Sequence, residues 1–65
     1  MKYIIYRIET PHLYVKYINS DGSATLTNNE SEAMLFNSEV EADAIIETIG
    51  GSNFWGTRPQ RPHGK

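Results

Sequence analysis

The sequence contains no cysteine and only two histidines, and each shortage restricts the chemistry open to this 65-residue chain. Without cysteine, neither a disulfide bond nor a thiolate zinc site can form. His12 and His63 lie far apart in the sequence, so we expect no metal site and no cofactor. A domain of this length buries only about 60% of its unfolded surface. We therefore expect an oligomeric partner or a ligand to add stability.

Long apolar runs are missing too. No stretch approaches the roughly 20 apolar residues of a membrane-spanning helix, and the first residues are typical of a strand rather than of a signal peptide. We expect a cytoplasmic protein that does not bind membranes.

Basic residues are absent from residues 30–47, which carry six carboxylates. Before position 57 the chain has three basic and eight acidic residues, a net charge of 3 − 8 = −5, whereas the last nine residues carry +3. The acidic body argues against binding of a long nucleic acid, because counterion release needs clustered cations. Residues 30–47 form either the solvated face of a helix or an acidic surface for a basic partner protein.

The residue pattern predicts four short strands and one helix. The expected strands cover residues 2–9, 12–19, 23–27 and 53–57. Ser38 and Glu41 form a capping box that begins a helix, and Gly50 ends it. The predicted fold class is α+β: a small antiparallel sheet of three to four strands with one helix on one face. This domain covers residues 1–57, and a basic, proline-containing tail follows at 58–65.

The two faces of the expected sheet carry different sets of apolar residues. We expect the core between the sheet and the helix to consist of Ile4, Tyr6, Ile8, Leu13, Val15, Tyr17, Leu26, Phe36, Ala42, Ile45, Ile46 and Ile49. The opposite face then carries Tyr3, Ile5, Arg7, Tyr14, Lys16 and Ile18. Such a half-apolar face reflects either strand propensity alone or a contact surface. We expect a contact surface, in which Tyr3, Ile5 and Ile18 form a homo-oligomer interface.

The sequence pattern places no nucleophile, base or metal ligand beside a suitable partner, so we expect a binding protein and not an enzyme. Trp55 offers an aromatic platform, and Arg58 and Arg61 follow it as cations for phosphates. The other candidate ligand-binding residues, on the uncovered sheet face, are Arg7, Tyr14 and Lys16. The structural alternative is that Trp55 fills the core and that the two arginines belong to a solvated tail.

Residues 3–49 resemble a class of very short phage-encoded proteins. The shared features are a Tyr/Ile hairpin (YIIYRIE and LYVKYI), the turn SEAMLF and a helix that opens with SEVEA. This class includes viral sponge proteins, which form small homo-oligomers and sequester the cyclic nucleotides that signal in bacterial anti-phage defence. The resemblance implies an immune-evasion protein of the host cytoplasm that binds a cyclic nucleotide, such as a cyclic dinucleotide. No site residue is transferred from that class.

Three functions therefore follow as hypotheses. The first is a homo-oligomer that sequesters a cyclic nucleotide through Trp55 and the arginines. The second is a small acidic inhibitor that binds a host protein through residues 30–47. A passive accessory role in a phage is a third.

Overall fold

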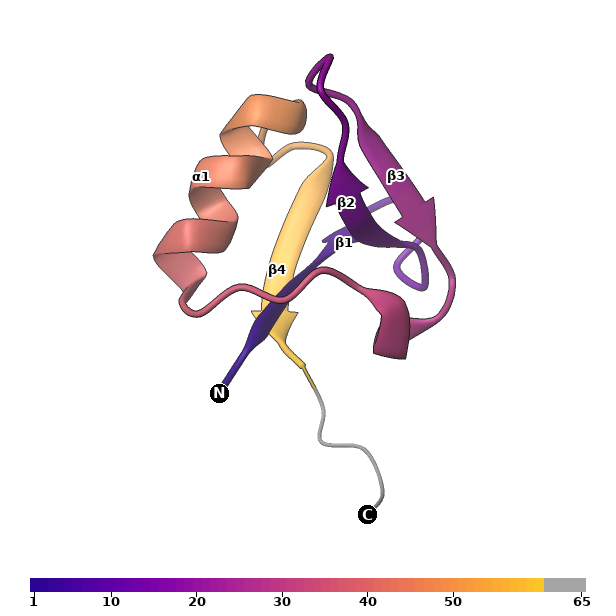
Figure 1. Cartoon of the computed structure of the whole chain (residues 1–65), viewed down its shortest axis with the longest axis vertical. Coiled ribbons are helices and arrows are strands. Elements are labelled where there is room, and N and C mark those ends of the chain that lie inside the picture. Colours follow the sequence, from indigo (N-terminus) through magenta and orange to yellow (C-terminus); the bar gives the residue numbers. More distant parts are fainter. Residues whose placement is uncertain (61–65) are drawn as a thin grey trace.

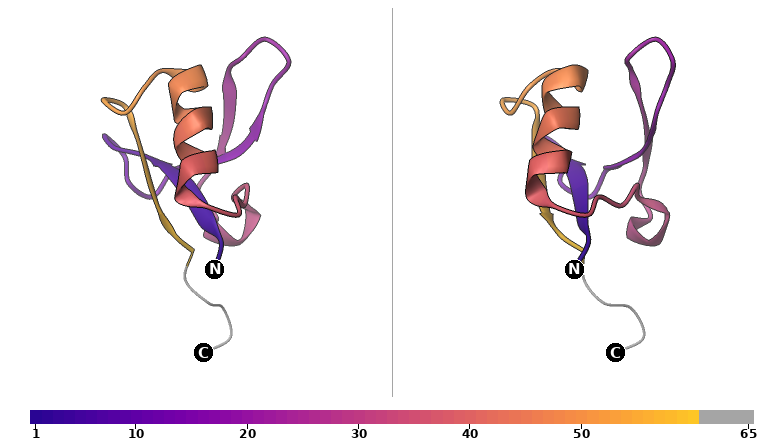
Figure 2. Two further views of the ribbon diagram at one scale, coloured as in Figure 1. Left: turned by 90° about the vertical axis from the view of Figure 1, so that its left-hand side faces the viewer. Right: turned by 60° about the vertical axis from the view of Figure 1, so that its left-hand side comes forward.

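The computed structural model describes residues 1–60 and shows a four-stranded antiparallel sheet with one α-helix on one face (Figure 1). The elements are β1 (Tyr3–Arg7), β2 (Tyr14–Ile18), β3 (Ala24–Thr27), the 3-10 turn η1 (Glu30–Glu32), α1 (Glu39–Ile49) and β4 (Trp55–Pro59). The spatial order is β3-β2-β1-β4, so the first and last strands are neighbours. Helix α1 packs mainly on β4 and β1, and the β2–β3 hairpin rises beside it (Figure 2). The predicted α+β class is confirmed.

Helix α1 begins and ends where the sequence predicts. The Ser38 Oγ accepts a hydrogen bond from the Glu41 amide (3.2 Å), and the Glu41 carboxylate accepts one from the Asn37 amide (3.1 Å). Gly50 ends the helix with a φ of 142°, a conformation that favours glycine. The Trp55 Nε1 then donates to the Ile49 carbonyl (3.1 Å). Both helix ends thus satisfy backbone groups that have no partner inside the helix.

Residues 34–36 lie between β1 and β2, where these two strands separate. The strands pair directly near their connecting loop. Farther along β1, Phe36 exchanges two backbone hydrogen bonds with Tyr3 (2.8 and 2.9 Å), and the Met34 amide donates to the Val15 carbonyl (2.8 Å). The segment therefore fills the opening between the strands and leads directly into the first turn of α1 (Figure 1).

The face of β1 that packs against the helix is the opposite of the predicted one. Ile5 lies in the cluster beneath α1 with Val15, Ala42 and Ile46, whereas Ile4 belongs to a separate cluster on the second face of the sheet. Both isoleucines are fully buried. The centre of the sheet is thus covered on both faces, a situation in which apolar alternation does not identify the helix side.

A bulge in β2 also changes the predicted core. The β2–β3 register shifts between Val15 and Tyr17, because β2 holds one extra residue at this point. Val15 and Ile18 consequently both pack toward α1, whereas Lys16 and Tyr17 are exposed. The prediction that Tyr17 and Ile8 belong to the core is wrong, since their exposed fractions are 51% and 44%.

The chain itself covers the second face of the sheet. Ala33, which follows η1, packs with Ile4 and Tyr14, and Tyr6 packs against them from the sheet. The Tyr6 ring also lies over Gly56, where an added Cβ would stand 2.5 Å from Tyr6 Cζ. The apolar residues of this face therefore have partners within one chain, and Tyr6 lies away from the helix side on which it was predicted.

Strand β4 continues past the predicted domain boundary at residue 57. Arg58 and Pro59 pair with Ile4 and Tyr3 of β1, so the boundary between the domain and the tail was predicted too early. The remainder of the predicted tail, from Arg61 onward, lies outside the described residues.

Within residues 1–60, no helix has the length and apolar character needed to span a membrane.

Candidate functional site

The structure divides the predicted ligand-binding residues between the two faces of the sheet. Arg7 and Trp55 meet on the helix side, where the Arg7 guanidinium lies 5.5 Å from the centroid of the Trp55 ring. Tyr14, Lys16 and Arg58 lie on the second face, beside η1. Arg61 lies outside the described residues. The two groups do not form one site.

Trp55 is a core residue. Its exposed fraction is 7%, and it belongs to the cluster beneath α1. Its indole N–H is hydrogen bonded to the end of α1, at the Ile49 carbonyl. A ring in this position stabilises the contact between helix and sheet and offers a ligand no open face. Of the two interpretations of Trp55, the position therefore fits the one in which it fills the core.

Arg58 holds η1 against the sheet. Its guanidinium donates to both carboxylate oxygens of Glu30 (3.2 and 3.3 Å) and to the Tyr14 hydroxyl (3.4 Å). It also lies 5.7 Å from the centroid of the Tyr14 ring. The hydrogen bonds with Glu30 raise the pKa of the Arg58 guanidinium above its ordinary value. An internal carboxylate thus occupies the arginine that was expected to bind phosphate.

The other basic side chains of residues 1–60 also have polar partners. Lys16 Nζ lies 3.8 Å from a Glu32 carboxylate oxygen, Arg7 lies 3.9 Å from Glu9, and Lys2 donates to the Asn37 side chain. Each pair is exposed at the surface, and such pairs contribute little to stability. A carboxylate beside each of Arg7, Lys16 and Arg58 nevertheless lowers the local attraction for a phosphate anion.

The predicted oligomer interface is not an open surface. Ile5 has an exposed fraction of 0%, and Tyr3 and Ile18 pack against the same cluster beneath α1. The interpretation that these three residues form an uncovered face is wrong, because the helix lies on their side of the sheet. Whether the chain forms homo-oligomers stays a prediction, but it needs a different surface.

The exposed side of α1 carries a row of carboxylates. Glu39, Asp43 and Glu47 are exposed and follow one another at four-residue intervals, which places them along one side of the helix. Within residues 1–60, no basic side chain forms an ion pair with any of the three. Val40, which lies beside this row on the helix surface, has an exposed fraction of 77%.

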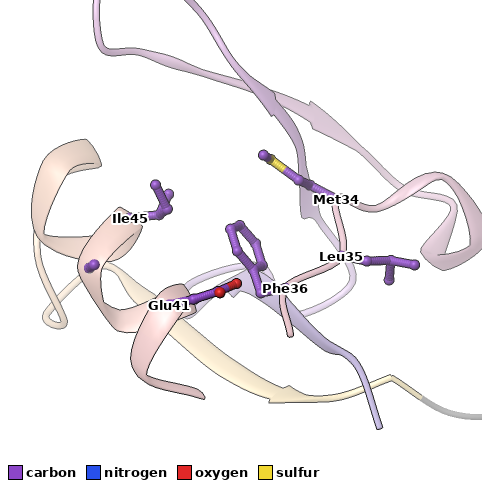
Figure 3. Close-up of a pocket in the computed structure, with 6 residues that line it drawn as sticks. Met34, Leu35, Phe36, Glu41 and Ile45 are labelled. Carbon is purple, nitrogen blue, oxygen red and sulfur yellow. The ribbon is translucent and has the colours of Figure 1, made fainter. Parts of the chain in front are cut away.

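A mainly apolar pocket of about 440 Å³ opens between α1 and the segment 34–36 (Figure 3). Its lining residues are Met34, Leu35, Phe36, Glu41, Ala44 and Ile45. The Phe36 ring stands between Ile45 and Met34, and the Glu41 carboxylate points from α1 toward Phe36 (Figure 3). The volume falls within the range of roughly 300–1,000 Å³ that is typical of ligand pockets.

The composition of residues 30–47 predicts either a solvated helix face or an acidic surface, but it does not predict this pocket. The available signal was the apolar triplet Met34–Phe36 directly before the capping box at Ser38 and Glu41. Such spacing brings an extended apolar segment beside the first helical turn. This spacing does not show that the Met34 and Phe36 side chains point toward α1, whereas the Leu35 side chain points away from the helix (Figure 3).

Within residues 1–60, no group of three His, Asp or Glu side chains is arranged to hold a metal ion. Comparisons of the chain with protein-family models, with curated proteins and with solved structures found no match.

Proposed function

We propose that this chain is a small binding domain that docks on a basic surface of another protein through residues 30–47. The observation that carries the proposal is the row Glu39, Asp43 and Glu47, three exposed carboxylates without a basic partner in residues 1–60. Helix α1 also lines an apolar pocket, on a different side from this row, and protein interfaces typically combine an apolar core with a polar rim. We infer a protein partner because residues 30–47 carry both features.

The row of carboxylates has a cost for the isolated helix. Like charges four residues apart destabilise a helix by about 0.2–0.5 kcal/mol per pair. Glu47 lies in the last turn, where the helix dipole disfavours a negative charge, and that turn holds no basic residue. Residues that destabilise their own helix, with no opposing charge inside the fold, are expected mainly at functional sites. A basic partner protein would supply the positive charge that these carboxylates lack in the isolated chain.

The proposal is tested by fluorescence anisotropy with a short labelled peptide that carries lysines at its ends and its centre. We expect binding that weakens as salt is added, because opposite charges across an interface are screened. The matched variants are Glu47→Lys and Glu9→Lys, which change the net charge equally. We expect Glu47→Lys to weaken binding about tenfold and Glu9→Lys much less, since Glu9 lies outside residues 30–47. Equal effects of the two reversals, or no binding at low salt, would contradict the proposal.

The cyclic-nucleotide function expected from the sequence is a separate prediction, and the same assay includes it. Its support is the resemblance together with Tyr14, Lys16 and Arg58, which lie on the second face of the sheet, where Arg58 contacts Tyr14. Labelled cyclic dinucleotides replace the peptide in this arm. Binding of a cyclic dinucleotide by a chain that ignores the lysine peptide favours sequestration and defeats the protein-binding proposal. Arg58→Ala is expected to weaken that binding if the second face is the site.

A further inference from the structure

From the pocket between α1 and residues 34–36, we infer a specific receptor for one lysine or arginine side chain of the partner protein. This inference rests on the proposed function, because it names the partner group that the acidic surface recognises. The apolar floor receives the methylene stem of the basic side chain, and the Glu41 carboxylate pairs with its charged end.

The lining of the pocket matches both parts of such a side chain. Met34, Phe36, Ala44 and Ile45 supply apolar surface, and Glu41 supplies the one titratable group. Lysine and arginine bury their aliphatic stems along apolar surface while their charged ends meet a polar group. A purely apolar ligand side chain would leave the carboxylate in the wall without a counter-charge. A purely polar one would leave the apolar floor uncovered.

Glu41 is held in place by its role at the helix start. One of its oxygens, Oε1, accepts the Asn37 amide hydrogen at 3.1 Å, and its own amide donates to Ser38. These contacts orient the carboxylate toward Phe36 across the pocket (Figure 3). A carboxylate has about four lone-pair positions, so one hydrogen bond from Asn37 leaves capacity for an incoming cation. Prior ordering of the acceptor lowers the entropic cost of binding.

The charge on α1 favours a basic partner over a second copy of this chain. The same helix carries Glu39, Asp43 and Glu47. Two copies that met symmetrically through α1 would bring these carboxylates together, and like charges across an interface are unfavourable. A lysine- or arginine-bearing segment instead meets the opposite charge of Glu41 at the pocket.

The test uses three peptides that share lysines at both ends and differ at one central position. That position is lysine, norleucine or alanine, so the series removes first the charge and then the stem. For the wild-type chain we expect lysine to bind about fivefold tighter than norleucine. We expect norleucine to bind about tenfold tighter than alanine, because its additional methylene groups become buried.

Two matched variants test whether Glu41 is the carboxylate that pairs with the central lysine of the peptide. Glu41→Gln keeps a side chain that serves in a capping box but removes the charge, so we expect lysine and norleucine to bind equally. Glu39→Gln makes the same change in the same helical turn, outside the pocket lining. It should weaken all lysine-ended peptides in parallel and keep the preference for central lysine. Equal loss of that preference in both variants would overturn the assignment of Glu41.

A second pair of variants tests the apolar floor. Ala44→Phe adds a ring that leans toward the preceding turn and so into the pocket, and it should abolish the preference for norleucine over alanine. Ser52→Phe adds the same ring at an exposed turn outside the lining and should preserve the preference. Thermal melting confirms that each variant is folded.

The outcomes separate this inference from the proposed function. Equal binding of all three peptides, with binding still weakened by Glu47→Lys, overturns the pocket assignment and leaves the acidic docking surface in place. No binding of any lysine-ended peptide at low salt overturns the docking function itself.

Discussion

The contact between Arg58 and Glu30 predicts a measurable energetic coupling between β4 and η1. The pair is bidentate, and the exposed fractions of the two side chains are 32% and 18%. Fully exposed ion pairs contribute about 0.2–1 kcal/mol, and we place this one near 1 kcal/mol because both side chains are partly shielded. Arg58→Ala also removes the contact with the Tyr14 ring, worth about 0.5–1 kcal/mol. We therefore expect Arg58→Ala to lower the free energy of unfolding by about 2 kcal/mol.

The assay is a double-mutant cycle by urea denaturation, followed by the fluorescence of the single tryptophan. The four proteins are the wild type, Arg58→Ala, Glu30→Ala and the double variant. The coupling free energy should be about 1 kcal/mol, and it should fall in high salt. In a domain of this size, 1 kcal/mol corresponds to about 4–8 °C in melting temperature. Tyr14→Phe removes the hydroxyl but keeps the ring, and it should cost less than Arg58→Ala.

The raised pKa of Arg58 determines how its contribution to the free energy of unfolding depends on pH. The hydrogen bonds with Glu30 raise its folded-state pKa above the ordinary value for an arginine. A raised pKa means that the stabilisation is complete below the unfolded value and is lost only as the pH rises through the folded one. The Arg58 contribution is therefore constant across the neutral range. A neutral effect of Arg58→Ala, or a coupling below about 0.3 kcal/mol, would refute the structural role of Arg58.

The remaining predictions concern the helix, the sheet and the hairpin turn. Glu47→Lys should raise the free energy of unfolding by about 0.5–1 kcal/mol, measured by thermal denaturation, because it removes a like-charge pair and suits the helix dipole. Gly56→Ala should destabilise by about 1–3 kcal/mol in urea titrations, since the new Cβ meets the Tyr6 ring, and Tyr6→Ala should relieve most of this loss. The hydroxyl and amide of Ser23 lower the pKa of Asp21, so that carboxylate stabilises the fold above the ordinary value of 3.8 and the effect is lost as pH falls through the lowered value. Asp21→Asn should therefore make stability less dependent on pH in acid; an unchanged acid dependence would contradict the assignment.

The sequence predicted the elements of this fold better than their orientation. The capping box at Ser38 and the stop at Gly50 depend on local chemistry, and both are confirmed. The inward face of β1 was predicted wrongly, because Ile4 and Ile5 are both apolar and both fully buried. Alternation identifies the core face only when the other face is polar. Two consecutive isoleucines in a short strand were the available sign that both faces are covered.

The candidate site shows the same limit. The register shift in β2 places Tyr17 at the surface and Ile18 in the core, and no local sequence pattern predicts a bulge at Lys16. The Arg58–Glu30 pair joins residues far apart in the sequence, so the prediction of a free arginine could not include it. By contrast, the acidic character of residues 30–47 depends on composition alone and carries over directly to the exposed side of α1.

The position of β1 between β2 and β4 has a consequence for folding kinetics. The Thr57 hydroxyl donates to the Ile4 carbonyl at 2.8 Å across 53 residues of chain. Pairing of this kind has a high contact order, and domains dominated by such contacts fold in about milliseconds to seconds. The β2–β3 hairpin and α1 have local contacts and can form early, whereas β1 acquires its second neighbour only when β4 arrives. During synthesis, one edge of β1 therefore has no strand partner until the chain has been made as far as Pro59. The burial of Ile4 and Ile5 is complete only after β4 pairs with this edge.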